Sequence, residues 1–198
     1  FFMKKLYLLL LTVFSLAAAD AQVQFGVKAG ANFSTFTGDV SGAKMKVGFH
    51  GGALVALPLF SEFSLQPEVM FSGQGTKFSE SGFTATWNAN YINVPVLFKY
   101  NNPTGFFAET GPQLGFLMSA KAKVSGQDDV DLKDQLNSTD FSWAIGVGYL
   151  IKTANIGIDA RYNIGLSNIA KDSGGGGSAK NSVFQVGVFY LFGSAGDK

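Results

Sequence analysis

The residue most suited to catalysis in this sequence is its single histidine, His50. A nucleophilic triad needs a base between a carboxylate and a hydroxyl, and His50 could be combined with Ser64 or Ser72 and with Glu68. Nothing in the spacing of these residues fixes that geometry, and a lone histidine among polar residues is more typical of a hydrogen-bond network. We therefore predict no catalytic residue, and an enzyme is kept only as an alternative.

Metal and cofactor sites are also poorly supported. The chain has no cysteine and one histidine, which excludes zinc–thiolate and multi-histidine sites. One segment is rich in aspartate but lacks the glycine and the closing glutamate of a calcium loop. Its acidic residues are Asp128, Asp129, Asp131 and Asp134. The glycine run 174–177 lacks the lysine of a phosphate-binding loop. No metal and no cofactor is predicted.

Composition limits the possible partners and the class of protein. The 198 residues include 15 basic and 14 acidic side chains, and no segment forms a basic stripe, so nucleic acid is not an expected partner. Only 15% of the residues are charged, against about a quarter in soluble domains. The length suits one domain.

The beginning of the chain has the pattern of an export signal. A basic start is followed by an apolar run and a small-x-small cleavage site. We interpret residues 1–21 as a secretory signal peptide, because the apolar run is shorter than the ~20 residues that a membrane anchor needs. Phe1 and Phe2 precede a methionine and are interpreted as a misplaced start. Residues 22–198 are the expected mature domain.

The mature chain is organised by a period of two. Residues 25–34 alternate apolar side chains with small or polar ones, which predicts a strand with two unlike faces. Seven more segments repeat the pattern. They are 47–57, 63–76, 91–100, 106–121, 141–151, 156–166 and 183–192.

The links between these segments alternate in length. Short links fall at 60–62, 101–104 and 152–154, and long polar links fall at 35–46, 79–90, 122–140 and 167–182. This alternation is typical of outer-membrane barrels. The predicted fold is all-β: an eight-stranded antiparallel up-and-down transmembrane β-barrel with short periplasmic turns and long extracellular loops.

One face of every segment is free of charge. In the sixth segment that face reads Phe141, Trp143, Ile145, Val147, Tyr149 and Ile151. A charged side chain facing lipid at the bilayer midplane costs ~2–4 kcal/mol, which explains the exclusion. A soluble lipocalin-like barrel would instead place its apolar face inside, and it is the alternative for a periplasmic ligand-binding protein.

The charged residues of the segments share the opposite face. They are Lys28, Glu68, Lys99, Glu109, Lys121, Asp159 and Arg161. The interior of an eight-stranded barrel is only wide enough for side chains, so charges there must pair. We expect the three acids to neutralise Lys28, Lys99 and Arg161, with Lys121 nearer the loop end. Inward glycines are expected to make room: Gly30, Gly52, Gly115, Gly148 and Gly157.

Two further residue types make local predictions. Tyrosines near strand ends suit the water–lipid boundary: Tyr91, Tyr100, Tyr149, Tyr162 and Tyr190. Proline cannot donate to a strand ladder, so we expect bulges or register breaks at Pro67, Pro95 and Pro112.

Several stretches resemble the PorT-like outer-membrane β-barrel family of Bacteroidetes. They are Gly26–Ser34, Leu65–Glu68, Val94–Tyr100, Glu109–Gly115 and Ala160–Leu166. The resemblance implies an eight-stranded barrel in the outer membrane and implies no activity. The last segment resembles the signal read by the barrel-assembly machinery. One named member of the family assists secretion, which makes a secretion-associated barrel another alternative.

Together these observations predict an integral outer-membrane protein with a structural or surface-interaction role, a closed polar lumen and no wide pore. Outer-membrane lipid and the barrel-assembly machinery are the expected partners, along with an unidentified surface ligand or envelope protein.

Overall fold

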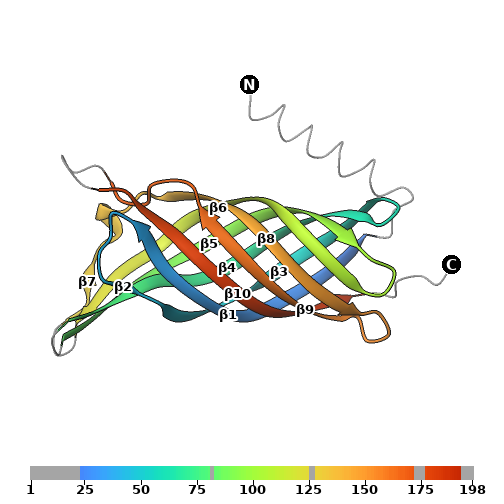
Figure 1. The fold of residues 1–198 in the computed structure, drawn as a ribbon, viewed down its shortest axis with the longest axis horizontal. Coiled ribbons are helices and arrows are strands. Elements are labelled where there is room, and N and C mark those ends of the chain that lie inside the picture. Colours follow the sequence, from blue (N-terminus) through green and yellow to red (C-terminus); the bar gives the residue numbers. More distant parts are fainter. Residues whose placement is uncertain (1–22, 81–82, 125–127, 172–176, 193–198) are drawn as a thin grey trace, which may run out of the picture.

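The computed structural model describes residues 23–80, 83–124, 128–171 and 177–192 (Figure 1). The predicted signal peptide, with Phe1 and Phe2, lies outside the described residues. Among the described residues, no helix is long and apolar enough to cross a membrane.

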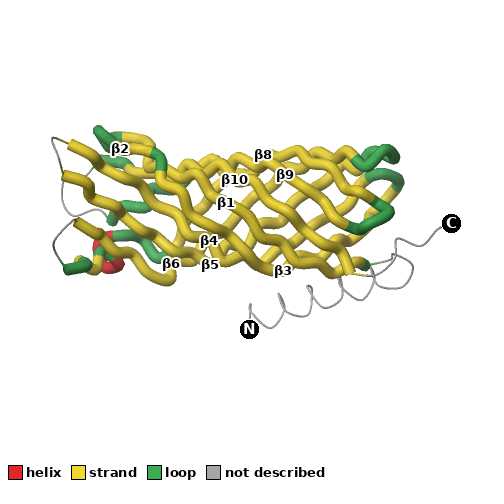
Figure 2. The backbone as a smooth tube through the Cα atoms, turned by 90° about the horizontal axis from the view of Figure 1, so that it is seen from below, coloured by secondary structure: helices red, strands yellow, loops and turns green. Residues whose placement is uncertain are grey.

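Eight long antiparallel strands form a closed barrel, as predicted (Figures 1 and 2). The strands are β1 (Gln24–Gly38), β3 (Lys46–Phe60), β4 (Phe63–Glu80), β5 (Phe83–Asn101), β6 (Phe106–Val124), β8 (Thr139–Ile151), β9 (Ile156–Gly165) and β10 (Ala179–Phe192). Each strand pairs with its neighbour in the chain, and β1 pairs with β10 from Phe25 opposite Phe192 to Gly38 opposite Ala179. This last ladder closes the barrel and leaves no free lateral edge in the wall.

The two ends of the barrel differ in their connections. Tight turns join β3 to β4, β5 to β6 and β8 to β9 at the end where the described chain starts and stops, which we call the turn end (Figure 1). The opposite loop end carries β2 (Ala43–Lys44), β7 (Val130–Asp131) and the 3₁₀ helix η1 (Lys133–Gln135). The alternation of short and long links is therefore confirmed except between β4 and β5, where the first strand ends at Glu80 and the second begins at Phe83.

Two of the predicted loops are largely strand. The link expected at 79–90 lies mostly in β4 and β5, which pair from Glu80 opposite Phe83 down to Phe63 opposite Tyr100. In the link expected at 35–46, β1 continues to Gly38, β2 forms Ala43–Lys44 and β3 begins at Lys46. The polar composition of these links led to the prediction of loops. The strands nevertheless continue beyond the apolar part of the wall, because backbone hydrogen bonds between strands do not require lipid-facing side chains.

The apolar faces point out of the barrel and the polar faces point in. All six residues of the predicted apolar face of β8 are exposed on the outer surface, from Phe141 to Ile151. The buried residues include many polar and charged side chains, which lie in the lumen. This arrangement is the reverse of a soluble ligand-binding barrel, whose interior is apolar. A barrel whose outer wall faces lipid requires this arrangement.

Two predictions on β5 and β6 are wrong, and a bulge explains one of them. Asn90 lies opposite Ser119 and Tyr91 opposite Leu117, so Met118 is an extra residue on β6. The bulge reverses the alternation of β6, and Lys121 is exposed near the loop end rather than on the inner face. Tyr91 is fully buried inside, not at the water–lipid boundary. Its position follows from the period of two, because it lies an even number of residues from inward-facing Asn93.

The three strand prolines cause no bulge. The β3–β4, β4–β5 and β5–β6 ladders each skip two pairs and resume in the same register, and each gap includes one of Pro67, Pro95 and Pro112. Proline has no N–H to donate, which explains the skipped pairs. The register shifts lie elsewhere, between Pro58 and Phe60 and between Asn90 and Tyr91. The prediction of bulges at the prolines is wrong.

Candidate functional site

The centre of the lumen holds an ion-pair network around Arg161. The Arg161 Nε donates to Glu109 Oε1 at 2.8 Å, and its terminal nitrogens donate to the two Glu68 oxygens at 2.8 and 2.9 Å. The arginine comes from β9 and the carboxylates from β4 and β6, so the network ties strands across the barrel. All three side chains are buried. Bidentate arginine–carboxylate pairs are among the strongest and most directional contacts in proteins.

Lys99 extends this network toward the turn end. Its Nζ donates to Gln66 Oε1 at 2.9 Å and lies 3.6 Å from Glu109 Oε2. The Gln66 amide in turn donates to Glu68 Oε1 at 2.7 Å. The ammonium also sits 3.7 Å from the centroid of the Phe107 ring, a favourable cation–π position. Lys99 is thus held by a carboxylate, an amide and an aromatic ring.

Lys28 and Asp159 form a second buried ion pair in the lumen. With this pair, the structure places all six predicted lumen charges inside the barrel. They comprise three cations and three carboxylates, so the network is neutral overall. They are Lys28, Glu68, Lys99, Glu109, Asp159 and Arg161.

Inward glycines provide the space for large side chains at this level. A Cβ on Gly157 would lie 2.0 Å from the Phe189 ring, and one on Gly148 would lie 2.3 Å from the Phe107 ring. The two rings contact each other edge to face, with centroids 5.8 Å apart. The lumen is therefore filled by charged pairs on one side of these rings and closed by the rings themselves.

Toward the loop end, the lumen continues as a network of amides and hydroxyls. Asn32 accepts a hydrogen bond from Gln185 at 2.8 Å, and its Oδ1 lies 2.8 Å from His50 Nδ1. The Asn32 amide donates to Ser72 Oγ at 3.0 Å. The histidine contacts neither a serine nor a carboxylate among the hydrogen bonds of the described residues, and Glu68 is bound by Arg161. The imagined triad of His50, Glu68 and a serine is therefore not assembled.

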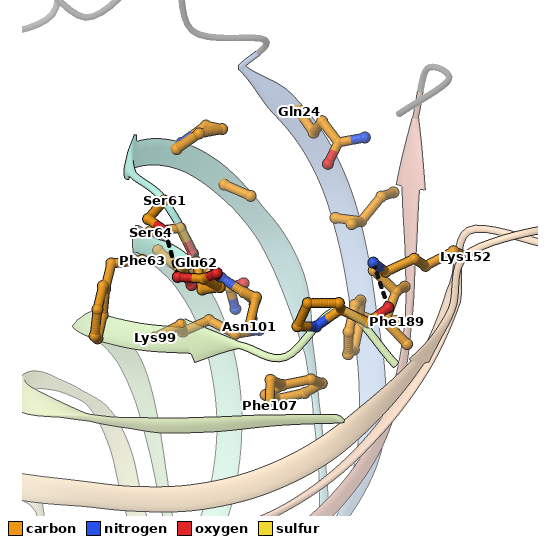
Figure 3. A pocket seen from close by; sticks show the side chains of 16 residues that line it. Gln24, Ser61, Glu62, Phe63, Ser64, Lys99, Asn101, Phe107, Lys152 and Phe189 are labelled. Carbon is orange, nitrogen blue, oxygen red and sulfur yellow. Dashed lines mark hydrogen bonds between the residues drawn. The ribbon is translucent and has the colours of Figure 1, made fainter. Parts of the chain in front are cut away.

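A cavity of about 580 Å³ opens at the turn end of the barrel (Figure 3). Lys99, Phe107 and Phe189 lie on its lumen side, and Glu62 and Lys152 come from the turns. The turn residue Glu62 accepts a hydrogen bond from the Ser61 hydroxyl, which lowers the pKa of the Glu62 carboxyl. The cavity stops at the rings and ion pairs, so it is a shallow mouth and not a channel.

A second cavity of about 400 Å³ lies at the loop end. Trp87 packs edge-on against both Phe36 and Phe78, with ring centroids 6.4 and 5.4 Å away. Leu136 and Ile169 add to its apolar lining, and among the described residues that line it Asp39 alone carries a carboxylate. This aromatic pocket differs in character from the charged lumen below it. It could accommodate an apolar group presented from the loop side.

The acidic segment after β6 forms internal contacts. Asp129 pairs with Lys123 at 3.4 Å, and Asp131 accepts a hydrogen bond from the Lys133 backbone N–H at 2.8 Å. Across the described residues, no group of three or more metal-ligating side chains converges. The aspartates thus belong to a solvated loop that folds onto the end of β6.

The sequence reasoning missed several inward polar residues at the loop end. Asp140 accepts hydrogen bonds from Asn181 and Ser167, both at 2.8 Å, and Lys46 donates to the Gln74 carbonyl at 3.2 Å. Asp140 could have been found, because it continues the alternation of β8 by one step. The two cavities had no sequence signal, because their walls come from residues far apart in the chain.

Comparison with known proteins gives the family and the fold. A family model described as "Outer membrane protein beta-barrel domain" matches residues 17–171. A search of curated proteins found no match. Among solved structures, Neisserial surface protein A (NspA) superposes with a TM-score of 0.53 and 17% identity, covering 85% of this chain and 97% of NspA.

Two other solved structures are similar at lower scores. The attachment invasion locus protein Ail of Yersinia pestis has a TM-score of 0.46 and 19% identity, covering 85% of this chain and 98% of Ail. A major outer membrane protein of Thermus thermophilus has a TM-score of 0.45 and 14% identity, covering 86% of this chain and all of that protein.

Proposed function

The chain belongs to the outer membrane protein beta-barrel domain family, and we propose that within the outer membrane it acts as a sealed scaffold that presents its loop end at the cell surface. The turn end then faces the periplasm, as is general for such barrels. The scaffold would support surface interaction or envelope integrity without transport and without catalysis.

The observation that carries this proposal is the filled lumen. Buried ion pairs centred on Arg161 cross the barrel, and the Phe107 and Phe189 rings pack against each other beside Lys99 where the lumen meets the turn-end cavity. A transport pathway would need water along the axis, whereas these side chains form ion pairs with one another and fill that space. His50, the residue most suited to catalysis, contacts Asn32 through Nδ1, and among the hydrogen bonds of the described residues it contacts no serine and no carboxylate.

Conductance in planar lipid bilayers tests the sealed lumen. We expect the refolded mature barrel to give no stable channel, at either polarity, above the background of protein-free bilayers. A porin refolded in the same detergent serves as the positive control. Stable, repeated conductance steps from the purified barrel would contradict the proposal.

Labelling of intact cells tests the surface orientation. The sequence has no cysteine, so single cysteines introduced by Lys133→Cys and Lys152→Cys report one end each. Both lysines are exposed, at the loop end and in the β8–β9 turn. We expect a membrane-impermeant maleimide to label the first variant on intact cells and the second only after permeabilisation. The opposite pattern would reverse the orientation and overturn the proposal.

The route to the membrane is part of the proposal. Residues 1–21 would direct export and be removed, and β10 would be read by the barrel-assembly machinery. N-terminal sequencing of protein from outer-membrane fractions tests the cleavage, with an expected new start at Gln22. A retained leader would contradict it.

The resemblance of Gly26–Ser34 and Glu109–Gly115 to PorT-like barrels supports a narrower placement within the family. We hold this placement as a proposal about kinship, and a role in secretion does not follow from it. Deletion of the gene tests whether the protein has a role in secretion, and we expect the levels of secreted proteins to be unchanged. A specific secretion defect, restored by the intact gene, would support the secretion alternative instead.

A further inference from the structure

Strand pairing aligns three lysines across the outer face of the barrel near its loop end. Lys44 of β2 lies opposite Lys77 of β4, Lys77 lies opposite Thr86 of β5, and Thr86 lies opposite Lys123 of β6. We call these four residues the basic row. Neighbouring strands are about 4.8 Å apart, so the row spans roughly 14 Å over consecutive strands.

All four side chains of the basic row point away from the lumen. Directly paired residues of a sheet share one face, and the residues flanking the row, such as Thr76 and Ala122, are buried on the other. Lys44, Lys77 and Lys123 are exposed. The row is therefore a surface feature of the barrel wall, separate from the ion pairs of the lumen.

At one end of the row, Lys44 and Lys77 have no ion-pair partner within the part of the chain that the structure describes. Like charges placed directly opposite each other destabilise a sheet, and Lys44 and Lys77 are such a pair. Among the ion pairs formed by the described residues, only Lys123 of the row has a partner, Asp129 at 3.4 Å. An anion bound between Lys44 and Lys77 would remove this repulsion.

The wall below the row is the lipid-facing surface. On β6, Met118 and Phe116 are exposed, and Val69 is exposed on β4. Five residues at about 3.3 Å each, on a strand tilted by about 40°, place Lys123 roughly 12 Å above Met118. A phospholipid headgroup layer is only about 5–7 Å thick. With Met118 taken as the upper edge of the apolar wall, the row lies above phospholipid phosphates, at a height that suits phosphates on a larger sugar headgroup.

We propose that the basic row is a binding site for the phosphate groups of an outer-leaflet glycolipid whose acyl chains lie against the apolar wall below it. Lys44 and Lys77 supply the charge and the Thr86 hydroxyl is a further donor. Lysine side chains can bend along the wall toward the membrane surface, which widens the reach of the site. The site anchors the loop end of the barrel to the outer leaflet.

Binding of diphosphoryl lipid A to the refolded mature barrel in a zwitterionic detergent tests the proposal. We expect the double variant Lys44→Gln/Lys77→Gln to bind about 30-fold more weakly than the wild type. The matched control Lys152→Gln/Lys171→Gln removes the same charge from exposed positions outside the row and should bind like the wild type. Unfolding in urea checks that both double variants remain folded barrels.

Three comparisons complete the test. Dephosphorylated lipid A should bind about as weakly to the wild type as lipid A binds to the Lys44→Gln/Lys77→Gln variant. Inorganic pyrophosphate and phosphatidylglycerol should each compete poorly with lipid A. Equal binding by the two double variants, or no effect of removing the phosphates, would overturn the site. Full competition by pyrophosphate would contradict the proposal that the ligand is a lipid. Full competition by phosphatidylglycerol would contradict the proposal that this lipid is a glycolipid.

Discussion

Replacing Arg161 with methionine is the sharpest test of the ion-pair network. The change removes three hydrogen bonds of 2.8–2.9 Å and one positive charge from a neutral lumen. Glu109 keeps its ion pair with Lys99, at 3.6 Å, and Glu68 keeps the Gln66 amide, at 2.7 Å. Breaking a buried ion pair by removing one partner costs about 3–5 kcal/mol. We expect the free energy of unfolding to fall by about that amount.

Urea unfolding of the barrel in detergent micelles, followed by tryptophan fluorescence, measures this loss. Lys152→Met is the matched control, since Lys152 is exposed and its Nζ donates to the Pro103 carbonyl. Its effect should stay within about 0.5 kcal/mol. Arg161→Lys keeps the charge but cannot make the bidentate contact, so its loss should be intermediate.

A second substitution separates loss of charge balance from loss of packing. Glu68→Gln restores neutrality in the presence of Arg161→Met, so the double variant should be more stable than Arg161→Met alone. A loss below about 1 kcal/mol for Arg161→Met would refute the reasoning. So would a double variant that is less stable than the single one.

Three other predictions concern the wall and the turns. Gly52→Ala would place a Cβ 2.0 Å from the Val69 carbonyl oxygen and should lower the free energy of unfolding in urea by about 1–3 kcal/mol. Gly51→Ala, whose Cβ would have its nearest atom 3.7 Å away, should be nearly neutral, and equal effects of the two variants would contradict this. Ile145→Lys puts a charge on the lipid face and should lower stability in vesicles by about 2–4 kcal/mol; no loss would mean that Ile145 faces water. The Glu62 carboxyl should titrate in NMR spectra below its usual pKa, because its charged form accepts the Ser61 hydrogen bond and loses it as the pH falls through that pKa. Ser61→Ala should raise the pKa of Glu62, and an unchanged titration would exclude the contact.

The period of two explains why most of the barrel could be predicted from sequence. Each strand must place one face in lipid, so the alternation from Phe141 to Ile151 predicts both that the segment is a strand and which of its faces points outward. The positions of Glu68 and Arg161 follow from the same alternation. Their mutual contact does not, because the pairing across the lumen depends on the tilt of strands that lie apart in the chain.

Features without a periodic pattern could not be predicted. The extra residue at Met118 changes the phase of β6 and moves Lys121 outward, and the pattern of apolar and polar residues contains no mark of such a single insertion. The long β4–β5 hairpin looked like a loop because its outward residues face water. The basic row was hidden for a related reason: Lys44 and Lys77 are 33 positions apart and meet only through strand register.

Accessibility of spin labels tests the central claim, that apolar side chains face lipid while the charged ones fill the lumen. Labels at Val69, Val147 and Ile158, all exposed on the outer wall, should relax strongly with oxygen and weakly with a water-soluble nickel chelate in lipid vesicles. A label at Lys133 in the loops should show the opposite preference. Strong relaxation by the nickel chelate at the three wall positions would contradict the account.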